Sequence, residues 1–148
     1  MKWLLDTNVL SESVRERPNR FVAQWLSEQP RIALAISLVT VAEVQHGILL
    51  TEDAIHARRL SRWVDEEILP FFADRILPIT LDITIRWLGL LRASMARRQN
   101  RAPADLFLAA TARIHNLTLV TRNTRDFANT GITVYNPWTD ETHTMEAP

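Results

Sequence analysis

The chain has 148 residues, of which 47% are hydrophobic and 23% charged, and this balance excludes a disordered or fibrous protein. Its 17 basic and 17 acidic residues cancel, so the net charge alone predicts no polyanionic partner. The sequence contains no cysteine, which excludes disulfide scaffolds, thiolate zinc sites and cysteine nucleophiles. We therefore expect a single domain over residues 1–148, with residues 138–148 as a C-terminal tail.

The uncharged stretches of the chain are short. One of them, Ile32 to Ala42, cannot cross a bilayer, because a membrane-spanning helix needs about 20 residues. The apolar run after Met1 is interrupted by Asp6, which argues against a secretory signal. These features predict a cytoplasmic protein with no membrane partner.

Short apolar runs rich in branched residues alternate with helical patterns along the chain. The runs predict strands at 3–5, 32–36, 76–79, 117–120 and 132–135. Helices are expected at 19–28, 40–50, 52–69, 82–98 and 104–115, with Pro70 ending the third and Pro103 opening the last. Strands that alternate with helices predict an α/β fold whose parallel sheet is covered on both faces.

Four carboxylates share one kind of position in this scheme. Asp6 directly follows the first predicted strand, and Asp126 lies in the loop after the fourth. Glu43 and Asp105 are expected in first helical turns, where the helix dipole favours a negative charge. In an open parallel sheet, strand carboxyl ends and helix N-termini meet at one edge, where ligands bind. We therefore expect the four acids to converge on one site.

Clustered carboxylates without cysteine, and with little histidine, are typical ligands of Mg²⁺ or Mn²⁺. The chemistry that such a cluster supports is metal-assisted hydrolysis of a phosphodiester. Taken singly, each acid also has a structural explanation, as a turn former, a helix-dipole partner or a solvated side chain. The metal-site hypothesis therefore depends on the position that the acids share. His46, three residues after Glu43, is either a neighbour of this site or incidental.

Arginines concentrate in the second half of the chain. Between Arg86 and Arg125 there are eight arginines and a single acid, Asp105. The planar guanidinium group suits phosphate oxygens, so this stretch is a candidate nucleic-acid surface, and a solvated helix face is the alternative. The candidate contact residues are Arg97, Arg98, Arg101 and Arg122.

Four segments resemble the motifs of PIN-domain ribonucleases. They are LLDTNVLSE at 4–12, VAEV at 41–44, ADLFLAATA at 104–112 and VTRNTRDF at 120–127. More narrowly, the chain is similar to VapC-type toxins of bacterial type II toxin–antitoxin pairs, in the branch that includes FitB. The resemblance implies a PIN-like α/β/α sandwich, with a parallel sheet of four or five strands flanked by helices.

The resemblance also implies residue roles and partners. The acids that match the family's Mg²⁺ or Mn²⁺ ligands are Asp6, Glu43, Asp105 and Asp126. Thr121 and Asn123 match the polar pair that orients the water and the acids, and Thr7 and Asn8 match the polar residues after the first acid. The implied protein is a metal-dependent endoribonuclease toxin that cleaves cellular RNA, such as tRNA or another structured RNA, and grips it through the arginine-rich stretch. Its implied partners are a VapB-like antitoxin, a second copy in a homodimer and, through the antitoxin alone, operator DNA.

Two other classes of function stay open. One is a non-catalytic PIN-like module that acts through an antitoxin complex bound to operator DNA. The intact set of four acids argues against it, because a scaffold has no need to keep mutually repelling carboxylates together. The other is a metal-dependent phosphatase for small substrates, which would require a deep narrow pocket in place of an open basic groove.

Overall fold

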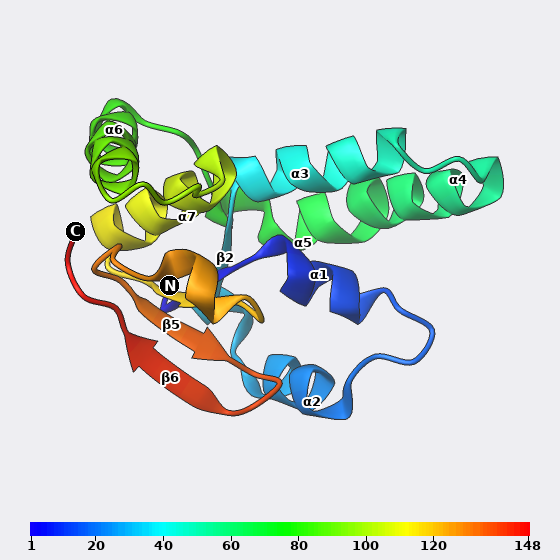
Figure 1. Cartoon of the computed structure of the whole chain (residues 1–148). Helices are drawn as coiled ribbons and strands as arrows, with labels where there is room; N and C mark the ends of the chain where they lie inside the picture. The colour runs from blue at the N-terminus through cyan, green and yellow to red at the C-terminus, as the bar shows by residue number, and fades with distance from the viewer.

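A computed structural model describes residues 1–148 and shows a twisted sheet between helices (Figure 1). The strands are β1 (Trp3–Leu5), β2 (Leu34–Ser37), β3 (Ile76–Leu77), β4 (Thr118–Val120), β5 (Thr133–Asn136) and β6 (Glu141–Thr144). Their order in the sheet is β3-β2-β1-β4-β5-β6. Strands β1 to β5 run parallel, and β6 pairs antiparallel with β5. The central strand β1 is therefore the point where the strand order reverses, next to which ligands bind in open α/β sheets.

Seven α-helices connect the strands. They are α1 (Thr7–Ser13), α2 (Arg20–Glu28), α3 (Leu38–Leu49), α4 (Ala54–Trp63), α5 (Leu69–Phe72), α6 (Leu81–Ala96) and α7 (Pro103–Ile114). A π-helical turn joins α4 to α5, and short 3₁₀ turns lie at Arg31–Ala33, Ala73–Arg75 and Thr124–Phe127. None of the helices combines the length and the apolar character that crossing a membrane requires.

Alternate strand residues point to opposite faces of the sheet, and each face has its own core. One face packs against α6 and α7 in a cluster of 15 buried residues that includes Leu4 and Leu119. The other face packs against α1, α2 and the α4–α5 segment in a cluster of 12 buried residues that includes Leu5 and Val120. Helices thus cover both faces of the sheet, which confirms the predicted α/β/α sandwich.

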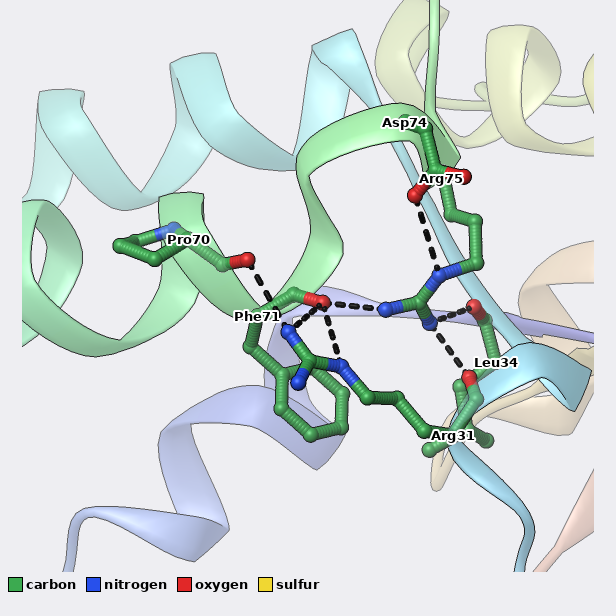
Figure 2. Close-up of polar contacts among 6 residues, drawn as sticks. All are labelled: Arg31, Leu34, Pro70, Phe71, Asp74 and Arg75. Atoms are coloured by element: carbon green, nitrogen blue, oxygen red, sulfur yellow. Dashed lines mark hydrogen bonds and ion pairs between the residues drawn. The ribbon is translucent and has the colours of Figure 1, made fainter.

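Two arginines join the end of α5 to the start of β2 (Figure 2). Arg75 is buried, and its guanidinium donates to the Leu34 carbonyl at 2.7 Å and to the carbonyls of Arg31 and Phe71. Arg31 reaches back from the other side and donates to the Phe71 carbonyl at 2.9 Å and to the Pro70 carbonyl at 3.1 Å. These bonds satisfy backbone oxygens at a corner where the chain leaves a helix, and they fix its path into β3.

The segment 138–148, expected to be a tail, contains β6, so the sheet has six strands in place of the predicted four or five. All four residues of β6 are exposed, and the strand forms by pairing its backbone with the outer edge of β5. Because neither face of β6 is buried, the segment lacks the apolar alternation that indicates a strand in a sequence.

Helix boundaries also differ from the predicted ones near two strand ends. Sequence patterns indicate no helix at 7–13, where the structure has the seven-residue helix α1, whose first N–H is accepted by the Asp6 side chain. Helix α3 begins at Leu38 in place of residue 40, because the Ser37 hydroxyl at the end of β2 accepts the Val39 N–H and caps the helix.

The helix expected at 52–69 continues past Pro70. The π-helical turn Val64–Ile68 comes just before it, and Pro70 lies in the first turn of α5, where a missing N–H is tolerated. The helical segment therefore reaches Phe72.

Candidate active site

Asp6 lies at the carboxyl end of the central strand β1, where its side chain is almost fully buried. Its Oδ1 accepts the backbone N–H of Thr7 at 2.7 Å. Its Oδ2 accepts the Thr121 hydroxyl at 2.8 Å and the Asn8 side-chain amide at 3.3 Å. These three bonds hold the carboxylate in one orientation and leave one of its acceptor positions free.

Thr121 follows the neighbouring strand β4 and is fully buried. Besides donating to Asp6, its hydroxyl accepts the Asn8 amide at 3.2 Å and the backbone N–H of Asn123 at 3.1 Å. The Asn8 side-chain oxygen in turn accepts the backbone N–H of Arg122 at 3.2 Å. Asn8 and Thr121 therefore bind α1 to the loop after β4, and they support the Asp6 carboxylate from two sides.

Glu43 is half-buried in the second turn of α3, because that helix begins at Leu38. The predicted position in a first helical turn is wrong, so the dipole of this helix does not act on Glu43 as we expected. The Thr7 hydroxyl at the start of α1 donates a 2.6 Å hydrogen bond to Glu43 Oε2 instead. This short bond connects α1 to α3 at the same sheet edge that carries Asp6.

Asp105 and Asp126 complete the set of four acids. Asp105 lies in the first turn of α7, two residues after Pro103, as predicted. Asp126 is exposed in the 3₁₀ turn Thr124–Phe127 that follows β4. Burial raises the pKa of Asp105 to about 6, and the negative charges of the other three acids act in the same direction. Arg101 opposes this increase, and its effect is smaller.

The pKa of Asp6 is raised as well. Burial is the main cause, and the charges of Glu43 and Asp126 add to it. The hydrogen bonds from Thr121 and Thr7 lower the pKa in part by stabilising the ionised form. Asp6 at the end of β1, Glu43 beside Thr7, and Asp126 in the turn after β4 lie at one edge of the sheet, where their negative charges repel one another.

The donor chemistry of this cluster fits a hard divalent cation. Its candidate ligands are carboxylate oxygens, and a positive ion among them would offset both the burial and the repulsion that raise the pKa of Asp6 and Asp105. No three Asp, Glu or His side chains, however, stand close enough together to coordinate one ion as they are arranged. The residues thus fit Mg²⁺ or Mn²⁺ by ligand type and by charge, but they do not form a preformed coordination site.

Two other candidates lie apart from this network. The Asn123 side chain is exposed and makes no hydrogen bond, although its backbone N–H contacts Thr121. His46 is exposed in the last turn of α3 and hydrogen-bonds to none of the acids. Asn8, by contrast, hydrogen-bonds to both Asp6 and Thr121, although the sequence indicates it only through the family resemblance.

The candidate RNA-binding arginines occupy different surroundings. Arg97 and Arg98 are exposed at the end of α6. Arg101 donates to the backbone carbonyl of Arg125 at 2.8 Å, which fixes its side chain to the protein itself. Arg122 is exposed and lies over the Trp138 ring, 5.4 Å from its centroid. Of the four, Arg101 is the one whose charge lowers the pKa of an acid in the cluster.

A groove of about 350 Å³ opens beside Glu43, between α1, α3 and α4. Thr7 and Glu43 line one end of it, and Arg59 and Trp63 of α4 line the other wall. Glu43 is the member of the four acids that lines this groove, and the groove is an open space between helices, unlike the deep narrow pocket that the phosphatase hypothesis requires.

The family model of the PIN domain matches residues 3–132, which include all four acids and Thr121. The chain belongs to the PIN-domain family. This confirms the family that the sequence motifs indicate, and the sheet and its covering helices agree with the fold that they imply.

Two PIN-domain relatives are similar over nearly their whole length. Toxin FitB of Neisseria gonorrhoeae is 36% identical over 137 residues, which cover 93% of this chain and 99% of FitB. VapC ribonuclease Y4jK of Sinorhizobium fredii is 33% identical over 135 residues, which cover 91% of this chain and 96% of that protein.

Solved structures of PIN-domain toxins have the same fold. FitAcB of Neisseria gonorrhoeae has a TM-score of 0.85 at 36% identity, covering 92% of this chain and 98% of the matched chain. FitAB bound to a DNA fragment also has a TM-score of 0.85, at 35% identity, with 95% and 99% covered. A toxin–antitoxin complex from Klebsiella pneumoniae has a TM-score of 0.67 at 32% identity, with 92% and 98% covered.

Proposed function

We propose that this PIN domain is a metal-dependent endoribonuclease toxin that cleaves cellular RNA in the cytoplasm. The observation that carries the proposal is the hydrogen-bonded arrangement of carboxylates at the end of β1, where Thr121 and Asn8 hold Asp6 and Thr7 holds Glu43. The similarity to a protein named as a VapC ribonuclease supports RNA as the substrate.

The site residues divide into ligands and supports. Asp6, Glu43 and Asp105 would hold one Mg²⁺ or Mn²⁺ ion, and Asp126 would hold a second ion or orient water. When bound, such an ion lowers the pKa of water and stabilises the leaving oxygen of a phosphodiester. Thr121 keeps Asp6 ionised and oriented by donating to the carboxylate.

Asn123 is a weaker candidate for orienting the water, because its side chain is free in the structure. Asn8 is the stronger supporting residue, since it contacts both Asp6 and Thr121.

The proposed partners follow from the relatives. FitB is named a toxin, the Klebsiella pneumoniae structure is a toxin–antitoxin complex, and FitAB is bound to DNA in its structure. We accordingly propose that a VapB-like antitoxin neutralises this chain, that two copies form a homodimer, and that operator DNA is contacted through the antitoxin alone.

The test is cleavage of total cellular RNA, including tRNA, by purified protein stripped of metal with a chelator. We expect cleavage at discrete sites after Mg²⁺ or Mn²⁺ is added, and none without metal or with the Asp6→Asn variant. Mapping the cut ends would identify the RNA.

Cleavage that resists the chelator, or full activity of Asp6→Asn, would contradict the nuclease proposal. If metal binds and no RNA in the pool is cut, while the chain still assembles with its antitoxin on operator DNA, the non-catalytic hypothesis is the better one.

A further inference from the structure

Helix α4 carries several positive charges beside Glu43. Its ten residues include Arg58, Arg59, Arg62 and His56, and no carboxylate. The flanking segments contain acids, at Glu52 and Asp53 before the helix and at 65–67 after it, so no basic run stands out in the sequence.

Two adjoining hollows connect α4 to the site. The groove that contains Thr7 and Glu43 is also lined by Arg15, His56 and Arg59. A second hollow, of about 730 Å³, is lined by three arginines, Arg58, Arg59 and Arg62, and by two acids, Glu66 and Glu67. Val14, Arg59 and Trp63 line both hollows, so the two hollows adjoin each other beside α4, and we refer to them together as the groove along α4.

The charges in this groove are available to a ligand. Arg58 and Arg59 are exposed, and neither takes part in a salt bridge. Arg62 pairs with Glu66 at 3.4 Å, but both side chains are largely exposed, and such a pair is weak in water. Arginines without a protein partner, lining a hollow that starts at a catalytic acid, are suited to hold phosphate groups.

We propose that the groove along α4 binds the RNA backbone next to the scissile phosphodiester, with Arg58 and Arg59 as the principal phosphate contacts. This inference rests on the proposed nuclease function. A strand whose phosphodiester lies at Asp6 and Glu43 must continue over an adjoining surface, and this groove adjoins Glu43 directly. It differs from the surface around Arg97 and Arg101, where the small hollow that both residues line includes none of the four acids.

The experiment compares two double variants that each remove two positive charges. Arg58→Gln with Arg59→Gln changes the groove, and the matched control, Arg17→Gln with Arg20→Gln, changes exposed residues at and before the start of α2, outside both arginine-rich surfaces. Both are made in the Asp6→Asn background, so that RNA stays intact during binding. The probe is a labelled 20-nucleotide single-stranded RNA of mixed sequence, titrated at several salt concentrations, and circular dichroism checks that every variant is folded.

We expect the groove variant to bind the RNA at least about tenfold more weakly than its Asp6→Asn parent at 100 mM salt. The slope of log Kd against log salt should fall by about 1.4, since each lost phosphate contact removes roughly 0.7 for a single strand. The control variant should stay within about twofold of the parent. In the active protein, the groove substitutions should raise KM for RNA and leave kcat nearly unchanged, because neither arginine lies among the acids.

Equal affinity and equal salt slope for the two double variants would overturn the inference. It fails equally if the groove variant binds and cleaves RNA normally but resists its antitoxin, since the groove is then a protein-binding surface. Both results presuppose that the wild-type chain cleaves RNA. If it cleaves none, the proposed function itself fails, and the two failures are therefore distinguishable.

Discussion

Thr121 donates a 2.8 Å hydrogen bond to Asp6, although 115 positions separate them in the sequence. The bond forms because β4 lies beside β1 in the sheet, with Val120 opposite Leu5, so the residues that follow both strands meet at one edge. Neither side chain is more than slightly exposed. The Thr121 hydroxyl thus favours the ionised form of Asp6, against the effect of burial, and orients the acid that we place at the centre of the site.

Replacing Thr121 with valine should impair catalysis more than folding. Valine has nearly the same shape, but it cannot donate to Asp6, so the pKa of Asp6 should rise further and its orientation should loosen. Loss of such a supporting partner typically reduces metal affinity or activity about 10- to 100-fold. We expect a decrease of that size in kcat/KM for RNA, measured at saturating Mg²⁺. Thr121→Ser keeps the hydroxyl and should retain most of the activity, and equal activity of the valine and serine variants would contradict the assigned role.

Removing one of the clustered charges should stabilise the protein while it contains no metal. The pKa of Asp105 is raised to about 6, so its ionisation costs free energy of folding as the pH rises toward 6. At pH 7.5, Asp105→Asn should therefore unfold at a higher urea concentration than wild type. We expect a gain of about 1–2 kcal/mol, because partial exposure screens the repulsion.

Adding Mg²⁺ should make wild type more stable than Asp105→Asn. An ion that binds the folded state at 100 times its Kd stabilises by about 2.7 kcal/mol, and Asp105→Asn should lose most of this gain. If the variant is no more stable than wild type without metal, or gains as much with it, Asp105 does not belong to a repelling cluster that an ion neutralises.

A buried carboxylate outside the site should make stability depend on pH. Glu12 accepts the backbone N–H of Asn19 at 2.7 Å and pairs with Arg15 at 3.2 Å, and these contacts hold its pKa below the ordinary value of 4.5. The folded state thus favours the ionised form, so the stabilisation is present above pH 4.5 and disappears as the pH falls through the lowered pKa. We expect Glu12→Gln to lose about 1–2 kcal/mol at pH 7.

Urea unfolding at a series of pH values tests this. The difference between wild type and Glu12→Gln should narrow below pH 4.5, while Glu16→Gln, at an exposed position in the same loop region, should match wild type throughout. If the difference in unfolding free energy between wild type and Glu12→Gln stays constant across the pH range, the charge of Glu12 is not the cause of that difference.

Arg75 should contribute much more to the stability of the fold than Arg31. Arg75 is buried and donates to three backbone carbonyls, whereas Arg31 is exposed and contacts carbonyls from the solvent side (Figure 2). Arg75→Ala would remove the side-chain donor of the buried Leu34 carbonyl together with two partly buried bonds, and it should destabilise the fold by about 2–4 kcal/mol. Arg31→Ala should cost less than about 1 kcal/mol, since water can replace it. Thermal unfolding of both variants measures how much stability each one loses. Equal losses of stability would contradict the larger role that we assign to Arg75.

The parts of the fold that are buried on both faces were predictable. Strands β1 and β4 are short apolar runs in the sequence. A proline marks the start of α7, and the cap Ser37 lies just before α3. The exposed strand β6 was not predictable, because it depends on the free edge of β5 and not on a pattern of its own.

The composition of the candidate site followed from the sequence better than its contacts did. The place of Asp6 at a strand end and of Asp105 in a first helical turn depends on local signals, which a sequence contains. The bond from Thr7 to Glu43 depends on how α1 meets α3, and the role of Arg59 depends on how α4 folds back beside them. Such contacts between distant segments leave no local pattern, which explains why the sequence does not single out the arginines of α4.

The most direct test of the four-acid site is calorimetric titration of Mn²⁺ into chelator-stripped protein. Wild type should bind the ion saturably, and so should Asp65→Asn, which removes an exposed acid from the turn after α4. Asp6→Asn and Asp105→Asn should each weaken binding at least about tenfold, because each removes a ligand and a charge. If wild type binds no ion, or if Asp6→Asn binds as tightly as Asp65→Asn, the four carboxylates do not form a metal site.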